Sequence, residues 1–137
     1  MGMMQKGVYQ DEFTAAYLMF GNGGYYNSPK MYTKVVNAAG EVLLQKEAEN
    51  NQVLDSDTAY VMNQLLQTVV TDPNGTGTEA KLNGIQVAGK TGTNENTDLT
   101  FVGCTPYFTA SLWMGYEDNS ELPSKYGYYS ARAWKNI

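Results

Sequence analysis

Ala88-Gly89-Lys90-Thr91-Gly92-Thr93 is the stretch that decides the fold of this chain. Apolar and polar residues alternate from Ile85 onward, and this pattern predicts a strand over Ile85–Thr93. Thr91 and Thr93 then lie on one face of the strand, where both hydroxyls can bind an anionic group. Lys90 adds a positive charge, Gly92 lets an extended peptide approach the backbone, and a free N–H on such an edge can bind an oxyanion. We expect the ammonium, the hydroxyls and the bare glycine all to face one cleft.

The letters of Gly84–Thr91 also match the phosphate-binding loop G-x-x-x-x-G-K-[ST]. That loop requires a buried strand before it and a helix after it, so that backbone N–H groups face the phosphates. Upstream, Gly75–Lys81 does not have the pattern of a buried strand. Downstream, Thr91–Asn96 is rich in β-formers and turn residues, which makes a poor helix start. We therefore reject nucleotide binding.

The flanking segments predict helices on both sides of a meander. Two further strands are expected over Thr100–Thr105 and Phe108–Tyr116, with connections short enough for antiparallel neighbours. Further upstream, the patterns predict a helix over Asp11–Phe20 that ends at Gly21–Gly24, a hairpin of Met31–Val36 with Glu41–Leu44, and a helix that follows Asp55–Asp57 and ends at Asp72–Gly75. Ala131–Lys135 begins a terminal helix. The order predicts an α+β fold, an antiparallel sheet flanked by helices.

Composition narrows the class of protein. The chain has 137 residues, 42% hydrophobic and 17% charged, which suits one globular domain. Its net charge of −5, without a basic run, argues against a nucleic-acid partner. No apolar stretch reaches the roughly 18 residues that a membrane span needs. Met1–Lys6 lacks the apolar region of a signal peptide, so we expect any anchor to lie outside this chain.

The absence of histidine restricts the chemistry. Without it, Ser-His and Cys-His pairs and His-ligated zinc are excluded. The single cysteine, Cys104, excludes an intrachain disulfide, and its place in an apolar strand pattern predicts an inert core thiol. Acid–base chemistry near neutral pH would require a lysine or a carboxylate with a shifted pKa. We expect no metal and no cofactor.

Nearly the whole chain resembles the penicillin-binding proteins, whose signature includes a K-T-G strand. Lys90-Thr91-Gly92-Thr93 matches that strand, and Gly75–Ala80 is similar to the family's G-T-G-x-x-A element ahead of it. Other segments agree in the same order, namely Phe20–Gly24 with Tyr26 and Pro29, then Asp98 with Phe101–Gly103 and Thr105-Pro106, then Ser111–Gly115. The Gly-Thr-Gly element resembles the bifunctional class, in which a glycosyltransferase domain precedes the transpeptidase domain.

The resemblance implies a partial penicillin-binding, β-lactamase-like fold and a D,D-transpeptidase that cross-links peptidoglycan stem peptides through an acyl-serine intermediate. Its partners would be a stem peptide and β-lactam antibiotics, at the extracytoplasmic face of a bacterial membrane. Lys90 and Thr93 would be catalytic, Lys90 in proton transfer and Thr93 through its oxyanion-hole N–H. Thr91, Gly92 and Thr93 would bind substrate.

The family's nucleophile, a Ser-x-x-Lys serine, has no match in this sequence, and neither has its Ser-x-Asn element. Both come earlier in the family's chain. We therefore expect residues 1–137 to be the C-terminal part of a transpeptidase domain, inactive without the missing N-terminal part. A fragment of a β-lactamase or D,D-carboxypeptidase, and a non-catalytic penicillin-sensing domain, remain the alternatives. An unpartnered sheet edge also raises the hypothesis of an edge-strand dimer.

Overall fold

The computed structural model describes residues 7–47, 49–123 and 127–137. Its elements, in chain order, are α1 (Gln10–Leu18), β1 (Tyr25–Tyr26), β2 (Lys34–Val36), β3 (Val42–Gln45), β4 (Asn51–Gln52), α2 (Ser56–Thr71), the 3-10 turn η1 (Thr78–Ala80), β5 (Ala88–Asn94), β6 (Asp98–Cys104), β7 (Thr109–Gly115) and α3 (Tyr129–Trp134). The predicted order of helix, hairpin, helix, three-strand meander and helix is confirmed. The short antiparallel pair of β1 with β4 was not predicted.

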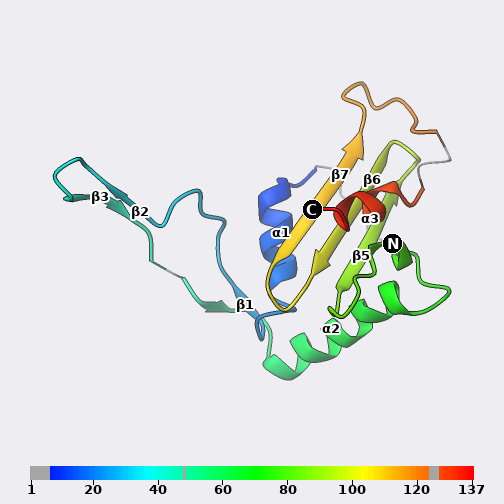
Figure 1. Ribbon diagram of the computed structural model, residues 1–137, viewed down its shortest axis with the longest axis horizontal. Helices are drawn as coiled ribbons and strands as arrows, with labels where there is room; N and C mark the ends of the chain where they lie inside the picture. Colours follow the sequence, from blue (N-terminus) through cyan, green and yellow to red (C-terminus); the bar gives the residue numbers. More distant parts are fainter. Residues whose placement is uncertain (1–6, 48, 124–126) are drawn as a thin grey trace.

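The centre of the fold is an antiparallel sheet in the order β5-β6-β7 (Figure 1). Its register is regular, with Ala88 opposite Cys104 and Asn94 opposite Asp98 on the first pair of strands. On the second pair, Cys104 lies opposite Thr109 and Asp98 opposite Gly115. Each strand has seven residues, so the meander forms without a bulge.

Helices cover both faces of this sheet. On one face, Gln10 and Thr14 of α1 bond to the hydroxyl of Ser111 in β7. On the other face, the indole N–H of Trp134 in α3 donates to the carbonyl of Ala110, at 2.9 Å. The Ala110 side chain also packs against the cluster that contains Trp134, and side chains of the neighbours Ser111 and Ala110 point to opposite faces. The two helices therefore enclose the sheet between them.

Each face has its own apolar core. On the α3 side, Phe101 at the centre of β6 is fully buried, in a cluster with Val70, Ala80, Val87, Ala131 and Trp134. On the α1 side, Leu66 of α2 joins Ala88 and Cys104, with Tyr17 and Phe20 packed against them. Helix α2 contributes to both clusters, so it fixes β5 to the rest of the molecule.

Local signals in the sequence account for most element ends. The first helix ends at Leu18, before the predicted end at Phe20, and its C-cap Met19 keeps a right-handed conformation. Gly23 and Gly24, in the turn that follows, have φ of 81° and 96°, a conformation that glycine adopts readily. Asp55 takes the extended N-cap conformation before α2, although its side chain makes no capping bond. Pro73 lies just after α2, where a helix cannot continue.

Three predicted strands are shorter in the structure, and the one expected over Phe108–Tyr116 is limited to Thr109–Gly115. The strand expected over Ile85–Thr93 begins only at Ala88, because its partner β6 ends at Cys104 and Pro106, which has no N–H, follows in the turn. The strand expected over Met31–Val36 is limited to Lys34–Val36, the part that faces β3. Partner length, rather than local preference, sets the starts of β5 and β2.

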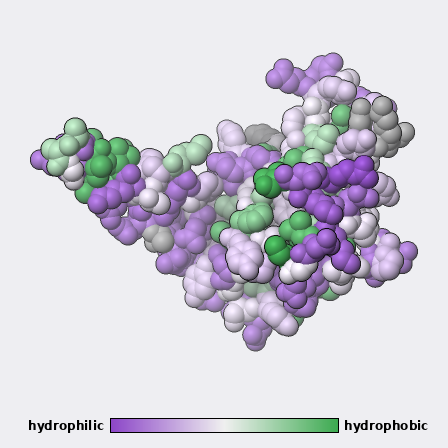
Figure 2. All heavy atoms as spheres, viewed as in Figure 1, coloured by the Kyte–Doolittle hydropathy of each residue, from purple (hydrophilic) through white to green (hydrophobic). Residues whose placement is uncertain are grey.

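The hairpin of β2 and β3 projects away from the body of the protein (Figure 1). Val42, Leu43 and Leu44 follow one another along β3, and all three are exposed. Apolar side chains accordingly gather on this hairpin in the surface view (Figure 2). An isolated two-stranded hairpin is only marginally stable in water, so this arm is the least supported part of the fold.

Among the described helices, none combines the length and apolar character that crossing a membrane requires.

Candidate active site

Strand β5 forms one edge of the central sheet and pairs only with β6 among the described strands. The K-T-G-T sequence, Lys90 to Thr93, occupies the middle of this strand. A strand, and not a loop followed by a helix, therefore contains Lys90 and Thr91, which confirms the rejection of the phosphate-binding loop. Ala88 and Gly89 are buried, whereas Lys90, Gly92 and Thr93 are exposed. The strand thus leaves the core at the K-T-G-T residues.

The cross-strand register assigns each side chain of β5 to a face. Thr91 lies opposite the buried Phe101, and Thr93 lies opposite Leu99, so both threonines are on the α3 face. This confirms that the two hydroxyls share a face. Lys90 and Gly92 alternate with them and lie on the α1 face. Neighbouring residues of a pleated strand point to opposite faces, so only the strand edge could bring the ammonium, the hydroxyls and the glycine to one cleft, and that expectation stays a prediction.

The ladder also determines which backbone groups of β5 are free. At the turn after β6, the N–H of Thr105 donates to the carbonyl of Phe108, at 2.9 Å. Hydrogen-bonded and non-bonded pairs alternate along an antiparallel ladder. This bond therefore shows which residues of β6 bond to β7 and which bond to β5. Residues 104, 102, 100 and 98 then bond to 88, 90, 92 and 94 on β5. The N–H and C=O groups of Gly89, Thr91 and Thr93 point away from β6, toward the open edge.

Lys90 reaches this open edge from the other face. Its Nζ donates to the carbonyl oxygen of Thr91, at 2.8 Å. That carbonyl is one of the groups that β6 does not use, so the ammonium lies at the unpaired edge of the strand. Lys90 therefore reaches a backbone group of the edge from the α1 face, whereas the threonine hydroxyls lie on the α3 face.

Gly92 is not required by packing among the described residues. A Cβ built on it would meet only the Cβ of Thr100, at 3.5 Å, which is an ordinary contact. By contrast, a Cβ on Gly89 would lie 2.5 Å from the ring of Phe101. Gly92 thus has space for a side chain, whereas Gly89, which is buried in the core, is needed for close packing.

The loop before β5 contributes a contact that the sequence patterns did not reveal. The hydroxyls of Thr76 and Thr91 are 2.6 Å apart, within hydrogen-bond distance. Thr76 lies in the Gly75–Ala80 element, whose only sequence signal was its likeness to the family pattern. Spacing alone does not show that this loop returns to the K-T-G strand.

On the strands of the sheet, Asp98 and Cys104 have shifted pKa values, and both shifts have structural causes. The indole N–H of Trp113 donates to Asp98 at 2.8 Å, and this bond is the main reason that the pKa of Asp98 is lowered. Burial raises the pKa of the Cys104 thiol, and its hydrogen bond to Thr109 opposes that shift. The buried, protonated thiol confirms the prediction of a core cysteine.

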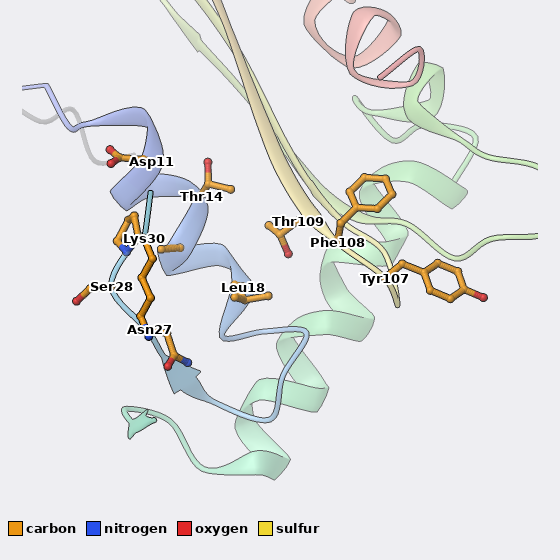
Figure 3. Close-up of a pocket in the computed structure, with 11 residues that line it drawn as sticks. Asp11, Thr14, Leu18, Asn27, Ser28, Lys30, Tyr107, Phe108 and Thr109 are labelled. Atoms are coloured by element: carbon orange, nitrogen blue, oxygen red, sulfur yellow. The ribbon is translucent and has the colours of Figure 1, made fainter. Parts of the chain in front are cut away.

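A hollow of about 690 Å³ lies elsewhere, between α1, the segment 27–30 and the turn 107–109 (Figure 3). Asp11 and Thr14 line it from the helix, and Lys30 runs along one side. None of the K-T-G-T residues lines this hollow. Within the described residues no group of three or more His, Cys, Asp or Glu side chains could hold a metal ion. The convergence of charge, hydroxyls and free backbone makes the edge of β5 the candidate site.

This combination of fold and site belongs to the penicillin-binding proteins. The sequence model of the penicillin-binding protein transpeptidase domain matches residues 11–134, and the chain is a member of that family. Penicillin-binding protein 1A of Clostridium botulinum is 37% identical over 138 residues, which cover 100% of this chain and 17% of the relative. Penicillin-binding protein 1A of Clostridium acetobutylicum is 39% identical over 118 residues, 85% of this chain and 14% of that protein. The chain therefore spans about a sixth of these relatives.

Solved structures agree with this assignment. The D,D-transpeptidase domain of a peptidoglycan glycosyltransferase from Eggerthella lenta superposes with a TM-score of 0.67 at 31% identity, covering 89% of this chain and 29% of that one. Penicillin-binding protein 1A from Haemophilus influenzae gives a TM-score of 0.72 at 16% identity, over 90% of this chain and 25% of the other. The second likeness concerns the fold alone. The predicted fold class, a partial penicillin-binding fold, is confirmed.

Proposed function

We propose that residues 1–137 are the C-terminal part of a serine D,D-transpeptidase domain and supply the substrate-binding edge of its active site. The observation that supports this most directly is the open edge of β5, with Lys90, Thr91 and Thr93 gathered on it. The chain contains no Ser-x-x-Lys, so the nucleophile must come from a segment outside it. The proposed site is therefore shared between this edge and an N-terminal part of the same domain.

The proposed role of the edge is to bind a stem peptide as an added strand. The N–H groups of Thr91 and Thr93 and the C=O group of Thr93, which β6 does not use, would pair with the peptide backbone. The hydroxyls of Thr91 and Thr93 would donate to its terminal carboxylate, and the Lys90 ammonium would attract that carboxylate and assist proton transfer. Gly92, which has no side chain, would leave room for the peptide.

The proposed chemistry is acyl transfer. The serine oxygen attacks the carbonyl of the penultimate D-alanine, and the negative charge on the carbonyl oxygen is stabilised by the serine N–H and the Thr93 N–H. The C–N bond then breaks, and D-alanine leaves with a proton on its amine. An amine of a second peptidoglycan strand attacks the acyl-serine ester, forms the cross-link and releases the serine. A β-lactam would acylate the same serine and remain bound.

The same proposal assigns the protein a place in the cell. Relatives named penicillin-binding protein 1A, and the Eggerthella lenta protein whose title joins a transpeptidase domain to a peptidoglycan glycosyltransferase, support the bifunctional class. The enzyme would act on the extracytoplasmic face of a bacterial membrane. Its anchor would lie in a segment that this chain does not contain.

Fluorescent penicillin labelling tests the proposal. This chain alone should not be acylated, whereas a polypeptide that contains this chain and an upstream Ser-x-x-Lys segment should be acylated at that serine. Lys90→Met in the longer polypeptide should lower the acylation rate by about 10²- to 10⁴-fold, the usual effect of a proton-transfer group. Labelling of any residue in the chain alone, or no labelling of the longer polypeptide, would contradict the proposal.

An edge-strand dimer is a separate proposal for the chain in isolation. The unused N–H and C=O groups of β5 can pair with a second copy when no peptide or domain part covers them. Light scattering across a concentration series should then show a dimer at high concentration. A monomer throughout the series would dispose of this proposal.

A further inference from the structure

The loop that carries Thr76 is held rigidly against the end of α2. The N–H of Gly75 donates to Asp72 O at 2.8 Å, and the N–H of Gly77 donates to Val69 O at 2.9 Å. A Cβ on Gly75 would lie 2.3 Å from the same Val69 oxygen, so only glycine fits this approach. The backbone position of Thr76 is therefore set by the contacts of its loop with the end of α2, and it does not depend on β5.

The 3-10 turn η1, which follows this loop, is also held in place. The N–H of Ala80 donates to Gly77 O at 2.9 Å, and Ala80 is fully buried in the core on the α3 face. Glu79 pairs with Arg132 of α3 at 3.0 Å. The segment thus connects α2, the sheet and α3, and it presents Thr76 to Thr91 from a supported position.

The hydroxyls of Thr76 and Thr91 are 2.6 Å apart, and only one of them can be the donor in the hydrogen bond between them. A hydroxyl has one donor hydrogen and two acceptor lone pairs. If Thr91 donates to Thr76, Thr91 has no hydrogen left for an anion. If Thr76 donates to Thr91, the Thr91 hydrogen is free to point at a carboxylate, and the two bonds reinforce each other.

We propose that Thr76 is a positioning residue, whose hydroxyl donates to Thr91 and so directs the Thr91 hydroxyl toward the terminal carboxylate of a bound peptide or β-lactam. The inference rests on the proposed function, because it assigns a task to Thr76 only when a carboxylate binds at the β5 edge. Thr76 itself does not touch the substrate. It acts by fixing the side-chain rotamer of Thr91 and the direction of its hydrogen.

The test uses the longer polypeptide that contains this chain and the serine segment, with the second-order rate of acylation as the measured quantity. Thr76→Val keeps the shape of the side chain but removes the hydroxyl, and it should lower that rate by about tenfold, the value of one hydrogen bond. Thr76→Ser retains the hydroxyl and should stay within about twofold of the unsubstituted protein, by the same reasoning.

Two controls separate positioning from a general loss of structure. Thr78→Val makes the same chemical change two residues away, at a hydroxyl with no hydrogen bond to β5, and should leave acylation unchanged. A β-lactam whose carboxylate is blocked as an ester should react slowly with every variant, and Thr76→Val should cost nothing further with it. The thermal midpoints of the variants should match.

The outcomes are distinguishable. If the unsubstituted polypeptide is not acylated, the proposed function fails, and the role of Thr76 fails with it. If that polypeptide is acylated but Thr76→Val reacts as fast, only the positioning role is overturned. The same conclusion follows if Thr76→Ser is as slow as Thr76→Val, or if the esterified β-lactam shows an equal tenfold loss.

Discussion

The indole of Trp134 lies directly against Gly103, so that a Cβ built on this glycine would stand 2.4 Å from the Trp134 Cζ2 atom. The contact joins α3 to the central strand β6, and the indole N–H completes it by donating to Ala110 O on β7. Phe101 adds an edge-to-face contact, with its ring centroid 5.2 Å from that of Trp134. A glycine near the end of β6 thus makes room for the helix that closes one face of the sheet.

Gly103→Ala should therefore destabilise the protein. The added methyl group overlaps the indole, and overpacking of this kind costs about 1–3 kcal/mol in the free energy of unfolding. Gly92→Ala is the matched control, because its Cβ would meet only Thr100 at 3.5 Å. Urea unfolding should show a lower midpoint for the first variant and an unchanged midpoint for the second. Equal midpoints for the two variants would contradict the assigned packing.

Phe101→Ala should be among the most damaging truncations. Phe101 has no exposed surface, and it lies at the centre of the core on the α3 face. Removing a buried phenylalanine ring costs about 3–5 kcal/mol, a large share of the stability of a small domain. Leu43→Ala on the projecting hairpin, where the side chain is 59% exposed, should change the free energy of unfolding by less than about 0.5 kcal/mol. A comparable loss in both variants would place the core elsewhere.

Asp98 should make stability depend on pH in the acid range. Hydrogen bonds to its carboxylate, first from Trp113, lower its pKa in the folded protein. Its contribution is then fully present above the pKa of an unfolded aspartate, about 3.9, and is lost as pH falls through the lower folded pKa. Below about pH 4, the urea midpoint should therefore fall less steeply in Asp98→Asn than in the unsubstituted protein.

Trp113→Phe separates the indole bond from the rest of the Asp98 site. This variant keeps the contacts of Asp98 with Thr97 and Asn94, and the pKa of Asp98 should move upward toward its usual range. An NMR titration of the Asp98 side-chain carboxyl measures the shift. An unchanged titration midpoint would show that the indole N–H does not cause the lowered pKa.

Cys104 should react slowly with a thiol reagent in the folded protein. Its side chain is buried, and burial raises the pKa of the thiol, so little thiolate is present. Reaction with Ellman's reagent should follow the opening of the structure, and it should become rapid in denaturant. Ser120→Cys, in a chain that also carries Cys104→Ala, provides an exposed thiol as the reference. A native Cys104 that reacts as quickly as this reference would mean that the core around β6 is open.

Some of these features could be predicted without coordinates because they are local. The apolar spacing of residues 11–20, the glycines after them and the alternation around Lys90 each reflect backbone preferences that act within a few residues. The order of these elements predicted the α+β class, and the likeness of Gly75–Ala80 and Lys90–Thr93 to the transpeptidase family predicted the partial penicillin-binding fold. Strand ends were less predictable, because Ala88 begins β5 only where Cys104 offers a partner.

The composition of the candidate site follows from the amino-acid sequence: an ammonium, two hydroxyls and a bare glycine on one strand, with no serine nucleophile signature. The arrangement of these groups follows from the packing of the strands and loops. The pleat separates Lys90 from Thr91 and Thr93 by face, and the ladder phase directs the free backbone groups of β5 outward. The loop at Thr76 returns to Thr91 across 15 residues of chain. Contacts between distant segments depend on how the elements pack together, and no local pattern encodes them.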